Sequence, residues 1–222
     1  INQEFIKKSV LLEVGTFGKS FILLSLSKKM KEVKRYIYLF RHGQTTYNRD
    51  KKFTGWQDPP LTSLGKKQAH LLAKKLKNKK FQIAFHTSLK RSKQTLSIVL
   101  MGHEECKEIK EDDRIIERNY GTLNGTTHEE LIRKQGKKAF EAIHRGFTVR
   151  PPKGESFADV EKRVTSFIKD LKKIMKKRNV NVAISAHGNS IRLFRKIMEK
   201  ASTKQACSWI IPYDKVFIHS IS

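Results

Sequence analysis

The sequence predicts an α/β fold with a mostly parallel central sheet and helices on both of its faces. After the first 29 residues, segments typical of buried strands alternate with helical segments of more than ten residues, which is typical of parallel sheets. Three predicted strands end in reactive side chains, at residues 41–42, at residues 87–91 and at His187. Because ligands bind at the carboxyl ends of such strands, these side chains should share one crevice.

The first predicted strand is YIYLF at residues 36–40, which is dense in aromatic and β-branched residues. A loop rich in turn residues follows at 53–62. Thr62 is a suitable cap for a helix that runs to about Lys77. The expected apolar stripe of this helix consists of Leu64, Leu71, Leu72 and Leu76.

A second strand is predicted for IAFHTS at residues 83–88, and the helical periodicity of residues 88–101 predicts the next helix. The sequence HEEC at 103–106 resembles half of a metal site. It has no second half elsewhere in the chain, so we interpret it as an exposed loop.

The second half of the chain continues the alternation. Thr127, with Glu130 three residues later, predicts the capped start of a helix over 127–144. The most clearly amphipathic segment is ESFADVEKRVTSFIKDLKKIMKK. The remaining expected elements are this helix at 155–177, a strand at 180–190, a helix at 190–199 and a strand at 215–221.

The composition limits the class of protein. No apolar stretch approaches the roughly 18–20 residues that a membrane span needs. Only two cysteines, Cys106 and Cys207, are present, which argues against a disulfide scaffold and predicts a reducing, cytoplasmic location.

The net charge is strongly positive, at +26, with 47 Lys and Arg against 21 Asp and Glu. A charge of this size attracts anions of many kinds, including phosphorylated metabolites and nucleic acids. Most of the excess is lysine spread along helices, which is typical of a solvated face. We therefore predict no specific nucleic-acid partner.

Residues 1–29 carry a short apolar patch, FILLSL at 21–26, flanked by lysines. They are either a targeting remnant or an upstream extension, disordered and without a part in catalysis. The patch is shorter than a typical signal core and the segment lacks arginine, so the second interpretation is favoured. The predicted catalytic domain spans residues 30–222.

The expected crevice contains the groups that phosphoryl transfer needs. Arg41 and Arg91 are permanent cations that can grip phosphate oxygens, and His187 adds a third donor. A neutral His42 could attack phosphorus through a ring nitrogen and form a phosphohistidine. Since no metal-ligand motif or P-loop is present, the predicted chemistry needs no metal.

The leaving oxygen would require a proton donor. Glu117 follows two isoleucines and precedes a glycine-rich turn. A carboxyl group against apolar neighbours can retain a proton and act as a general acid. From the residues alone, a surface ion pair between Glu117 and Arg118 is favoured, because it is the commoner fate of such a dipeptide.

Four motifs in order resemble those of the histidine phosphatase superfamily, also called the phosphoglycerate-mutase-like superfamily. They are RHG at 41–43, SLKRSKQT at 88–95, ERNYGTLNG at 117–125 and AHGNSIR at 186–192. The resemblance extends from about residue 35 to residue 220. It implies a three-layer α/β/α sandwich, in agreement with the pattern of elements.

The resemblance also implies roles for single residues. His42 would be the phosphorylated nucleophile, Arg41, Arg91 and His187 would grip the phosphoryl group, and Glu117 would be the proton donor. The implied substrate-binding residues are Asn48, Thr54, Gly55, Asn189 and Arg145.

The motifs disagree about the branch of the superfamily to which they are most similar. NRDKKFTGWQDPPL and ERNYG resemble mutases, whereas LTSLGKKQA and PPKGES resemble phosphatases. The insertion typical of mutases is missing from 145–163, and the closing C-terminal tail is not found. His144 and His128 stand where mutases have an arginine and a lysine for the substrate carboxylate.

We therefore expect a phosphatase that acts on phosphomonoesters through His42 without a cofactor, because an open pocket admits water to the phosphohistidine. The alternative is a mutase that interconverts 3- and 2-phosphoglycerate and needs 2,3-bisphosphoglycerate as primer. A third hypothesis is a non-enzymatic binder of acidic partners. The predicted partner is a small phosphorylated substrate, and a homodimer is compatible with the sequence.

Overall fold

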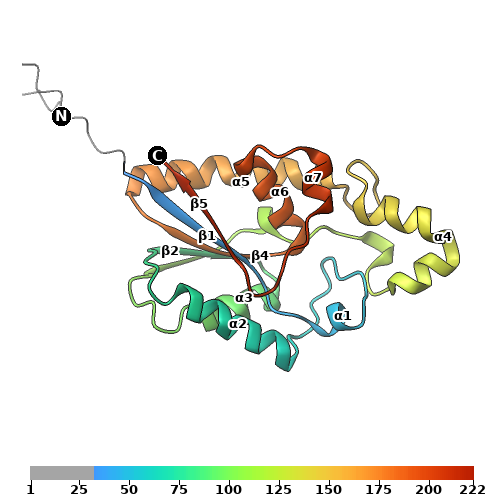
Figure 1. Ribbon diagram of the computed structural model, residues 1–222, viewed down its shortest axis with the longest axis horizontal. Coiled ribbons are helices and arrows are strands. Elements are labelled where there is room, and N and C mark those ends of the chain that lie inside the picture. The colour runs from blue at the N-terminus through green and yellow to red at the C-terminus, as the bar shows by residue number, and fades with distance from the viewer. Residues whose placement is uncertain (1–32) are drawn as a thin grey trace, which may run out of the picture. The chain divides into compact units, whose positions relative to one another are not determined.

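The computed structural model describes residues 33–222 as a five-stranded sheet between helices (Figure 1). The order of strands is β3-β2-β4-β1-β5, and every neighbouring pair is parallel except β1 and β5. The fold is thus the predicted α/β sandwich with a mostly parallel sheet. The strands are β1 (Arg35–Arg41), β2 (Ile83–His86), β3 (Glu108–Glu111), β4 (Val182–Ala186) and β5 (Val216–Ile221).

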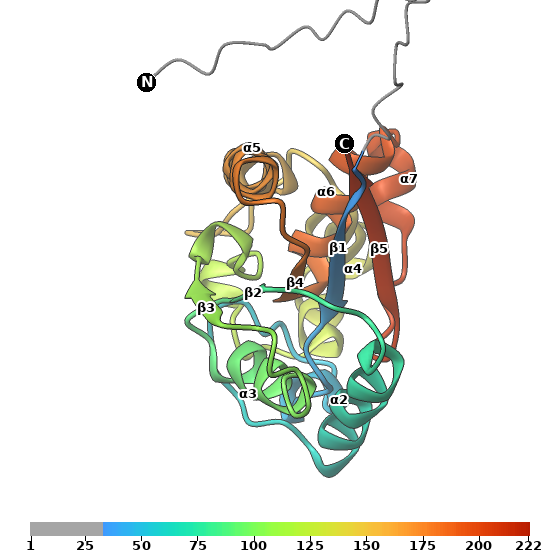
Figure 2. The same ribbon diagram turned by 90° about the vertical axis from the view of Figure 1, so that its left-hand side faces the viewer.

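The helices form two layers that cover opposite faces of the sheet (Figure 2). Helices α5, α6 and α7 lie on one face and α2 and α3 lie on the other. Helices α1 and α4 belong to the region beyond the carboxyl ends of the strands (Figure 1). The helices are α1 (Thr46–Arg49), α2 (Ser63–Leu76), α3 (Lys90–Val99), α4 (His128–Arg145), α5 (Phe157–Arg178), α6 (Gly188–Glu199) and α7 (Thr203–Ser208).

Strand β1 shows how the sheet divides the core. Ile37 and Leu39 pack into the cluster beneath α5 and α6, whereas Tyr38 and Phe40 pack into the cluster above α2 and α3. This alternation follows from the period of two in a strand. Because the central strands are buried on both faces, they read as continuous apolar runs, which made them easy to predict.

The capping predictions are confirmed by the local geometry. Thr62 accepts a hydrogen bond from the Gly65 amide at the start of α2. Thr127 and Glu130 form a reciprocal capping box at the start of α4, with distances of 3.1 and 2.8 Å. Helix α4 is interrupted at Gly136, where φ is +83° and the backbone leaves the helical region.

The predicted apolar stripe of α2 is half wrong. Leu72 and Leu76 are buried, but Leu64 and Leu71 are 50% and 47% exposed. The positions that face the sheet with Leu72 and Leu76 are Gly65 and Ala69. At Gly65 the backbone of α2 lies close to the backbone of Gln44, and an added Cβ would lie 2.1 Å from the Gln44 carbonyl oxygen. A larger residue does not fit at this position.

The prediction that HEEC at 103–106 is an exposed loop is wrong for its histidine. His103 is only 5% exposed, and its ring lies 4.4 Å from that of Phe81. Its Nδ1 atom lies 2.9 Å from the Glu105 carboxylate. The histidine therefore packs against the core. No group of three possible ligand side chains in residues 33–222 lies close enough to hold a metal.

Within residues 33–222, no helix is both long and apolar enough to cross a membrane. The prediction for residues 1–29 lies outside the described residues, so the domain boundary at residue 30 stays a prediction.

The packing of α2 gives a test with an internal control. Replacing Leu72 with alanine should lower the free energy of unfolding by about 2–5 kcal/mol, because Leu72 is fully buried. The neighbouring Leu71→Ala change should stay within about 0.5 kcal/mol, because Leu71 is half exposed. Urea unfolding of both variants measures the difference; equal losses would contradict the observed orientation of α2.

Candidate active site

The carboxyl ends of β1, β2 and β4 meet at one place, as the sequence predicted. His42 follows β1, Thr87 follows β2 and His187 follows β4. The backbone amide of His42 donates to the carbonyl of Ala186 at 3.1 Å, so the chain holds the ends of β1 and β4 in register. The sheet therefore brings His42 and His187 together, with their ring centroids 5.0 Å apart.

His42 is held with one defined nitrogen available. Its Nδ1 atom lies 2.7 Å from the Gly43 carbonyl, and a carbonyl can only accept, so Nδ1 carries the proton. The lone pair is then on Nε2, which accepts a hydrogen bond from Nε of Arg91 at 3.3 Å. Burial, followed by the positive charges of Arg91 and Arg41, holds the pKa of His42 well below its ordinary value. The imidazole is therefore neutral, as a nucleophile must be.

Arg91 is completely buried beside His42. Its terminal nitrogens donate to the carbonyls of Gln57 and Gly55 at 2.6 and 2.8 Å. Burial lowers the pKa of Arg91 to about 10, against the opposing effects of Glu117 and Asp58. The guanidinium therefore keeps its charge at neutral pH and is fixed next to the nucleophilic nitrogen.

His187 is also fully buried, and its Nε2 atom lies 2.9 Å from the hydroxyl of Thr87. Its Nδ1 atom is buried without a hydrogen-bond partner among the described residues. Burial, with further contributions from Arg91 and His42, holds the pKa of His187 well below its ordinary value. A buried nitrogen without a partner is costly. In the tautomer with the proton on Nδ1, Nε2 accepts from the Thr87 hydroxyl and Nδ1 is a free donor for a bound anion.

Arg41 reaches the site from the last position of β1. Its guanidinium packs against the backbone of Gly188, where an added Cβ would lie 3.4 Å from the guanidinium carbon. One nitrogen donates to the carbonyl of Ile211 at 3.0 Å, and the ring of Tyr213 lies 4.1 Å from the guanidinium carbon. Arg41 is therefore held between the ring of Tyr213 and the start of α6.

Glu117 approaches from the loop that follows the short turn Asp113–Ile115. One carboxylate oxygen accepts from the backbone amides of Arg118 and Asn189, at 2.8 and 3.1 Å. The side chain is 7% exposed and lines the cavity described below. The alternative of an exposed Glu117–Arg118 ion pair is wrong, because the Arg118 guanidinium instead donates to the carbonyls of Glu155, Ile143 and Val149.

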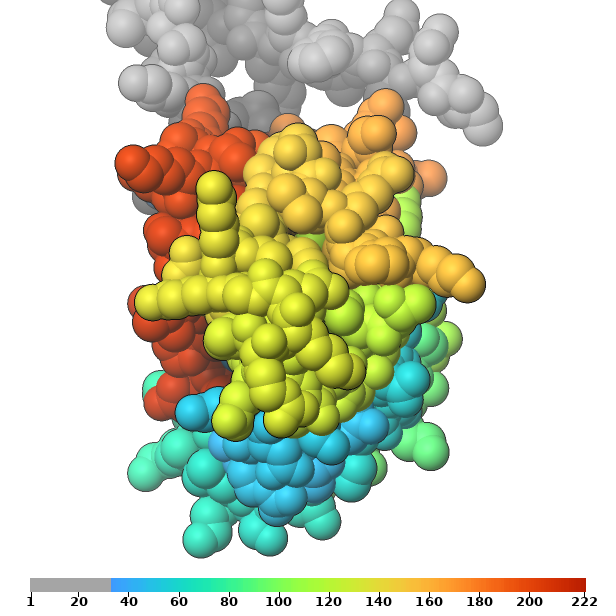
Figure 3. Space-filling model, turned by 90° about the vertical axis from the view of Figure 1, so that its right-hand side faces the viewer, coloured from blue at the N-terminus to red at the C-terminus, as the bar shows by residue number. Residues whose placement is uncertain are grey.

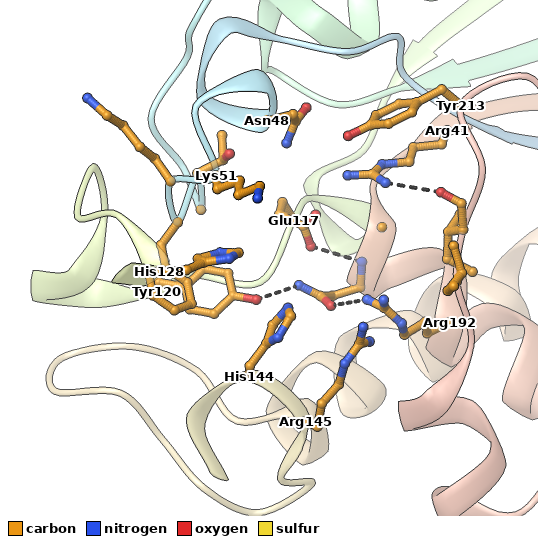
Figure 4. Close-up of a pocket in the computed structure, with 18 residues that line it drawn as sticks. Arg41, Asn48, Lys51, Glu117, Tyr120, His128, His144, Arg145, Arg192 and Tyr213 are labelled. Carbon is orange, nitrogen blue, oxygen red and sulfur yellow. Dashed lines mark hydrogen bonds between the residues drawn. The ribbon is translucent and has the colours of Figure 1, made fainter. Parts of the chain in front are cut away.

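A cavity of about 280 Å³ opens beside these buried groups (Figure 4). Figure 3 shows the face of the molecule on which α4 lies, coloured yellow-green, between the α1 region and the C-terminal segments. Seven of the ten predicted site residues line the cavity, whereas His42, Arg91 and His187 are buried next to it. The seven are Arg41, Asn48, Thr54, Gly55, Glu117, Arg145 and Asn189.

The predicted substrate-binding residues are partly engaged with the protein itself. Asn48 accepts from Thr45 in the capping box of α1. The hydroxyl of Thr54 is buried without a partner among the described residues. Asn189 is the most connected: its side chain donates to the Tyr120 hydroxyl and accepts from Arg192 at 2.5 Å (Figure 4).

Two histidines form a neutral part of the cavity wall. The rings of His128 and His144 lie 5.3 Å apart and pack around Phe53 and Phe140. Burial and the neighbouring charge of Arg145 lower the pKa of His144 to about 3. Burial and Lys51 lower the pKa of His128 as well. At neutral pH this wall therefore carries no charge from its histidines.

Several residues of the cavity were not predicted from the sequence. Arg192 follows Asn189 by three positions on α6, a spacing that places both on one helix face and could have indicated it. Tyr213 and Ile211 lie in a connection without periodicity and reach the site only through the tertiary fold. Burial lowers the pKa of Arg192 to about 10, so it remains a cation.

Comparison with known proteins places this site in a family. A model of the histidine phosphatase superfamily (branch 1) matches residues 37–218. The 2,3-bisphosphoglycerate-dependent phosphoglycerate mutase of Bartonella henselae is 35% identical over 179 residues, which cover 79% of this chain and 87% of that protein. The phosphoglycerate mutase of Schizosaccharomyces pombe is 36% identical over 160 residues, covering 70% and 75%.

Solved structures share the fold. YhfR of Bacillus stearothermophilus has a TM-score of 0.72 and 28% identity, covering 83% of this chain and 90% of its own. A mycobacterial glucosyl-3-phosphoglycerate phosphatase in complex with VO3 has a TM-score of 0.69 and 26% identity, covering 78% and 86%. With a family match over most of its length and relatives above one third identity, the chain belongs to the histidine phosphatase superfamily.

Proposed function

We propose that the protein hydrolyses phosphomonoesters through a phosphohistidine on His42. The observation that carries this proposal is the state of the His42 ring, with Nδ1–H bound to the Gly43 carbonyl and the Nε2 lone pair beside Arg91. The neutral ring is a competent nucleophile, and the buried cations can stabilise the charge that develops on the phosphoryl oxygens.

In the first step, Nε2 of His42 would form a bond to phosphorus while the bond to the leaving oxygen breaks. Arg91 would shift its Nε hydrogen bond from Nε2 to a phosphoryl oxygen, and Arg41 and His187 would supply further donors. Glu117 lines the cavity with one carboxylate oxygen that makes no hydrogen bond to residues 33–222. From there a protonated Glu117 would donate its proton to the departing alcohol.

In the second step, the same carboxylate would accept a proton from water as the water oxygen attacks the phosphohistidine. Release of inorganic phosphate returns His42 to its neutral form. The cations that stabilise the phosphoryl oxygens and the carboxylate that moves the proton all come from the chain, and we therefore propose the hydrolysis without a metal or an organic cofactor.

The first prediction of this mechanism concerns His42. His42→Ala should lower kcat for p-nitrophenyl phosphate by more than about 10⁴-fold, because the covalent step is lost. The matched control is His86→Ala, since His86 also follows a strand end and its Nδ1 also lies near the next carbonyl, at 2.8 Å from Thr87. Phosphate released at rates similar to wild type by the His42 variant would contradict the mechanism. Native protein quenched during turnover should carry phosphate that is labile in acid and stable in base.

The role of Glu117 is tested by the leaving group. Glu117→Gln should reduce kcat about 10²–10⁴-fold for alkyl phosphates, whose alkoxide leaving groups need a proton. The loss should be much smaller for p-nitrophenyl phosphate, because nitrophenolate departs without protonation. Parallel assays of the two substrates measure the ratio; an equal loss on both would show that Glu117 does not act as the acid.

The second candidate is a mutase, because relatives at about 35% identity carry the name of 2,3-bisphosphoglycerate-dependent phosphoglycerate mutases. Arg145, Arg192 and Lys51 could hold a second anionic group in the same cavity. Against it, His128 and His144 are uncharged, which weakens the grip on a phosphoglycerate that must stay bound while it turns.

One assay separates the two candidates. With 3-phosphoglycerate and catalytic 2,3-bisphosphoglycerate, a phosphatase should release inorganic phosphate faster than it forms 2-phosphoglycerate. Both products can be followed in one preparation by ³¹P NMR. Isomerisation that outpaces phosphate release would overturn the preference for hydrolysis and favour the mutase.

A further inference from the structure

Residues 207–214, which we call the 207–214 segment, connect α7 to β5 and pass along the cavity. Three arginines from three different elements donate hydrogen bonds to its backbone. Arg145 comes from the end of α4, Arg192 from α6 and Arg41 from the end of β1. Their hydrogen bonds to backbone carbonyls measure 3.0, 2.9 and 3.0 Å and end on Cys207, Trp209 and Ile211, respectively.

The backbone of the segment explains why its carbonyls are available to the arginines. Trp209 has φ of −59° and ψ of 141°, which lie in the polyproline II region, so the chain leaves the helix there and its carbonyls need partners outside the segment. Cys207 lies in the last turn of α7, where carbonyls have no partner within the helix. The segment thus presents a row of acceptors to the cationic side of the cavity.

The far end of the segment is anchored outside the cavity. Lys75 of α2 donates to the carbonyl of Asp214 at 2.6 Å and lies 3.5 Å from its carboxylate. The preceding residue, Tyr213, covers the guanidinium of Arg41 (Figure 4), and the guanidinium carbon lies 4.1 Å from the ring centroid. The centroid of the same ring lies 6.5 Å from that of His42. Lys75 does not line the cavity, but it fixes the residue next to Tyr213.

We propose that the 207–214 segment positions Arg41, Arg145 and Arg192 for an anionic substrate, and that Lys75 is a positioning residue that acts through Asp214 and Tyr213. This proposal rests on the proposed function. A guanidinium has five donors, so arginines that each give one or two to the protein keep others for a ligand. Because coupling between sites is reciprocal, an anion held by these arginines must also stabilise the segment.

The anchor is tested with two neighbouring lysines. Lys75→Met removes the contact with Asp214, and Lys74→Met is the matched control, since Lys74 is exposed on the same helix and contacts no acidic group within residues 33–222. Without ligand, amide hydrogen exchange of residues 209–211 and of Tyr213 should be faster in Lys75→Met than in wild type and unchanged in Lys74→Met. Inorganic phosphate should slow this exchange in wild type.

Kinetics provide the second readout. With p-nitrophenyl phosphate, Lys75→Met should raise KM about two- to fivefold at unchanged kcat, as expected for one exposed ion pair, whereas Lys74→Met should match wild type. Tyr213→Leu should raise KM and the Kd of inorganic phosphate about tenfold. Tyr213→Phe should restore both to within about twofold, because the ring over Arg41 remains.

Identical exchange and KM in the two lysine variants would overturn the proposal, as would equal damage from Tyr213→Phe and Tyr213→Leu. If wild type turned over no phosphomonoester, the proposed function would fail by itself. The exchange measurement without ligand would still decide whether Lys75 anchors the segment, and exchange that phosphate does not slow would overturn its link to anion binding.

Discussion

The hydrogen bond between Nδ1 of His42 and the Gly43 carbonyl is the contact on which the chemistry of this site depends. It determines which nitrogen has the lone pair, and the acceptor is the backbone carbonyl of the adjacent residue. Gly43 lies directly against Gly65 at the start of α2, and a Cβ added at Gly43 would lie 2.1 Å from the Gly65 oxygen. A side chain at position 43 would therefore displace the backbone that carries this carbonyl.

A second strand-end histidine shows that this orientation is not sufficient for a site. His86 follows the same rule at the end of β2, with Nδ1 at 2.8 Å from the Thr87 carbonyl. Its neighbour across space is Glu111, at 3.9 Å, in place of buried arginines. What distinguishes His42 is the set of cations that the fold delivers to its free nitrogen. The position of Arg91, on the first turn of α3, is as important as the nucleophile itself.

Much of this architecture could be predicted from the sequence because its determinants are local or topological. The period of two in β1, the caps at Thr62 and Thr127, and the rule that ligands bind at the carboxyl ends of parallel strands required no tertiary information. Strand β3 escaped prediction because its four residues are mostly charged, as is common at a sheet edge. Helices α1 and α7, with four and six residues, are too short to show a period.

The cavity itself was less predictable. Its lining residues come from segments that are far apart in the sequence, and no sequence period predicts which of these segments touch. Tyr213 packs on the Arg41 guanidinium and precedes Asp214, whose carbonyl accepts a hydrogen bond from Lys75. Leu71 is exposed because α2 buries the face that carries Gly65, Ala69 and Leu72. Sequence patterns identify which face of a helix is apolar, but they do not show where backbones approach each other. His42, Arg91 and His187 could be found because each follows a strand or begins a helix, whereas Glu117 lies in a loop and was assigned through the resemblance to the family.

The full burial of Arg91 has a consequence for the energetics of the reaction. Water has already been removed from this guanidinium when the chain folds, and the carbonyls of Gly55 and Gln57 have taken its place. A phosphoryl group that arrives therefore meets a dipole arrangement that hardly has to rotate as charge moves. In bulk solvent, water would have to reorient around the guanidinium in every turnover. Here the cost of removing that water arises once, when the chain folds, and it lowers the free energy of unfolding.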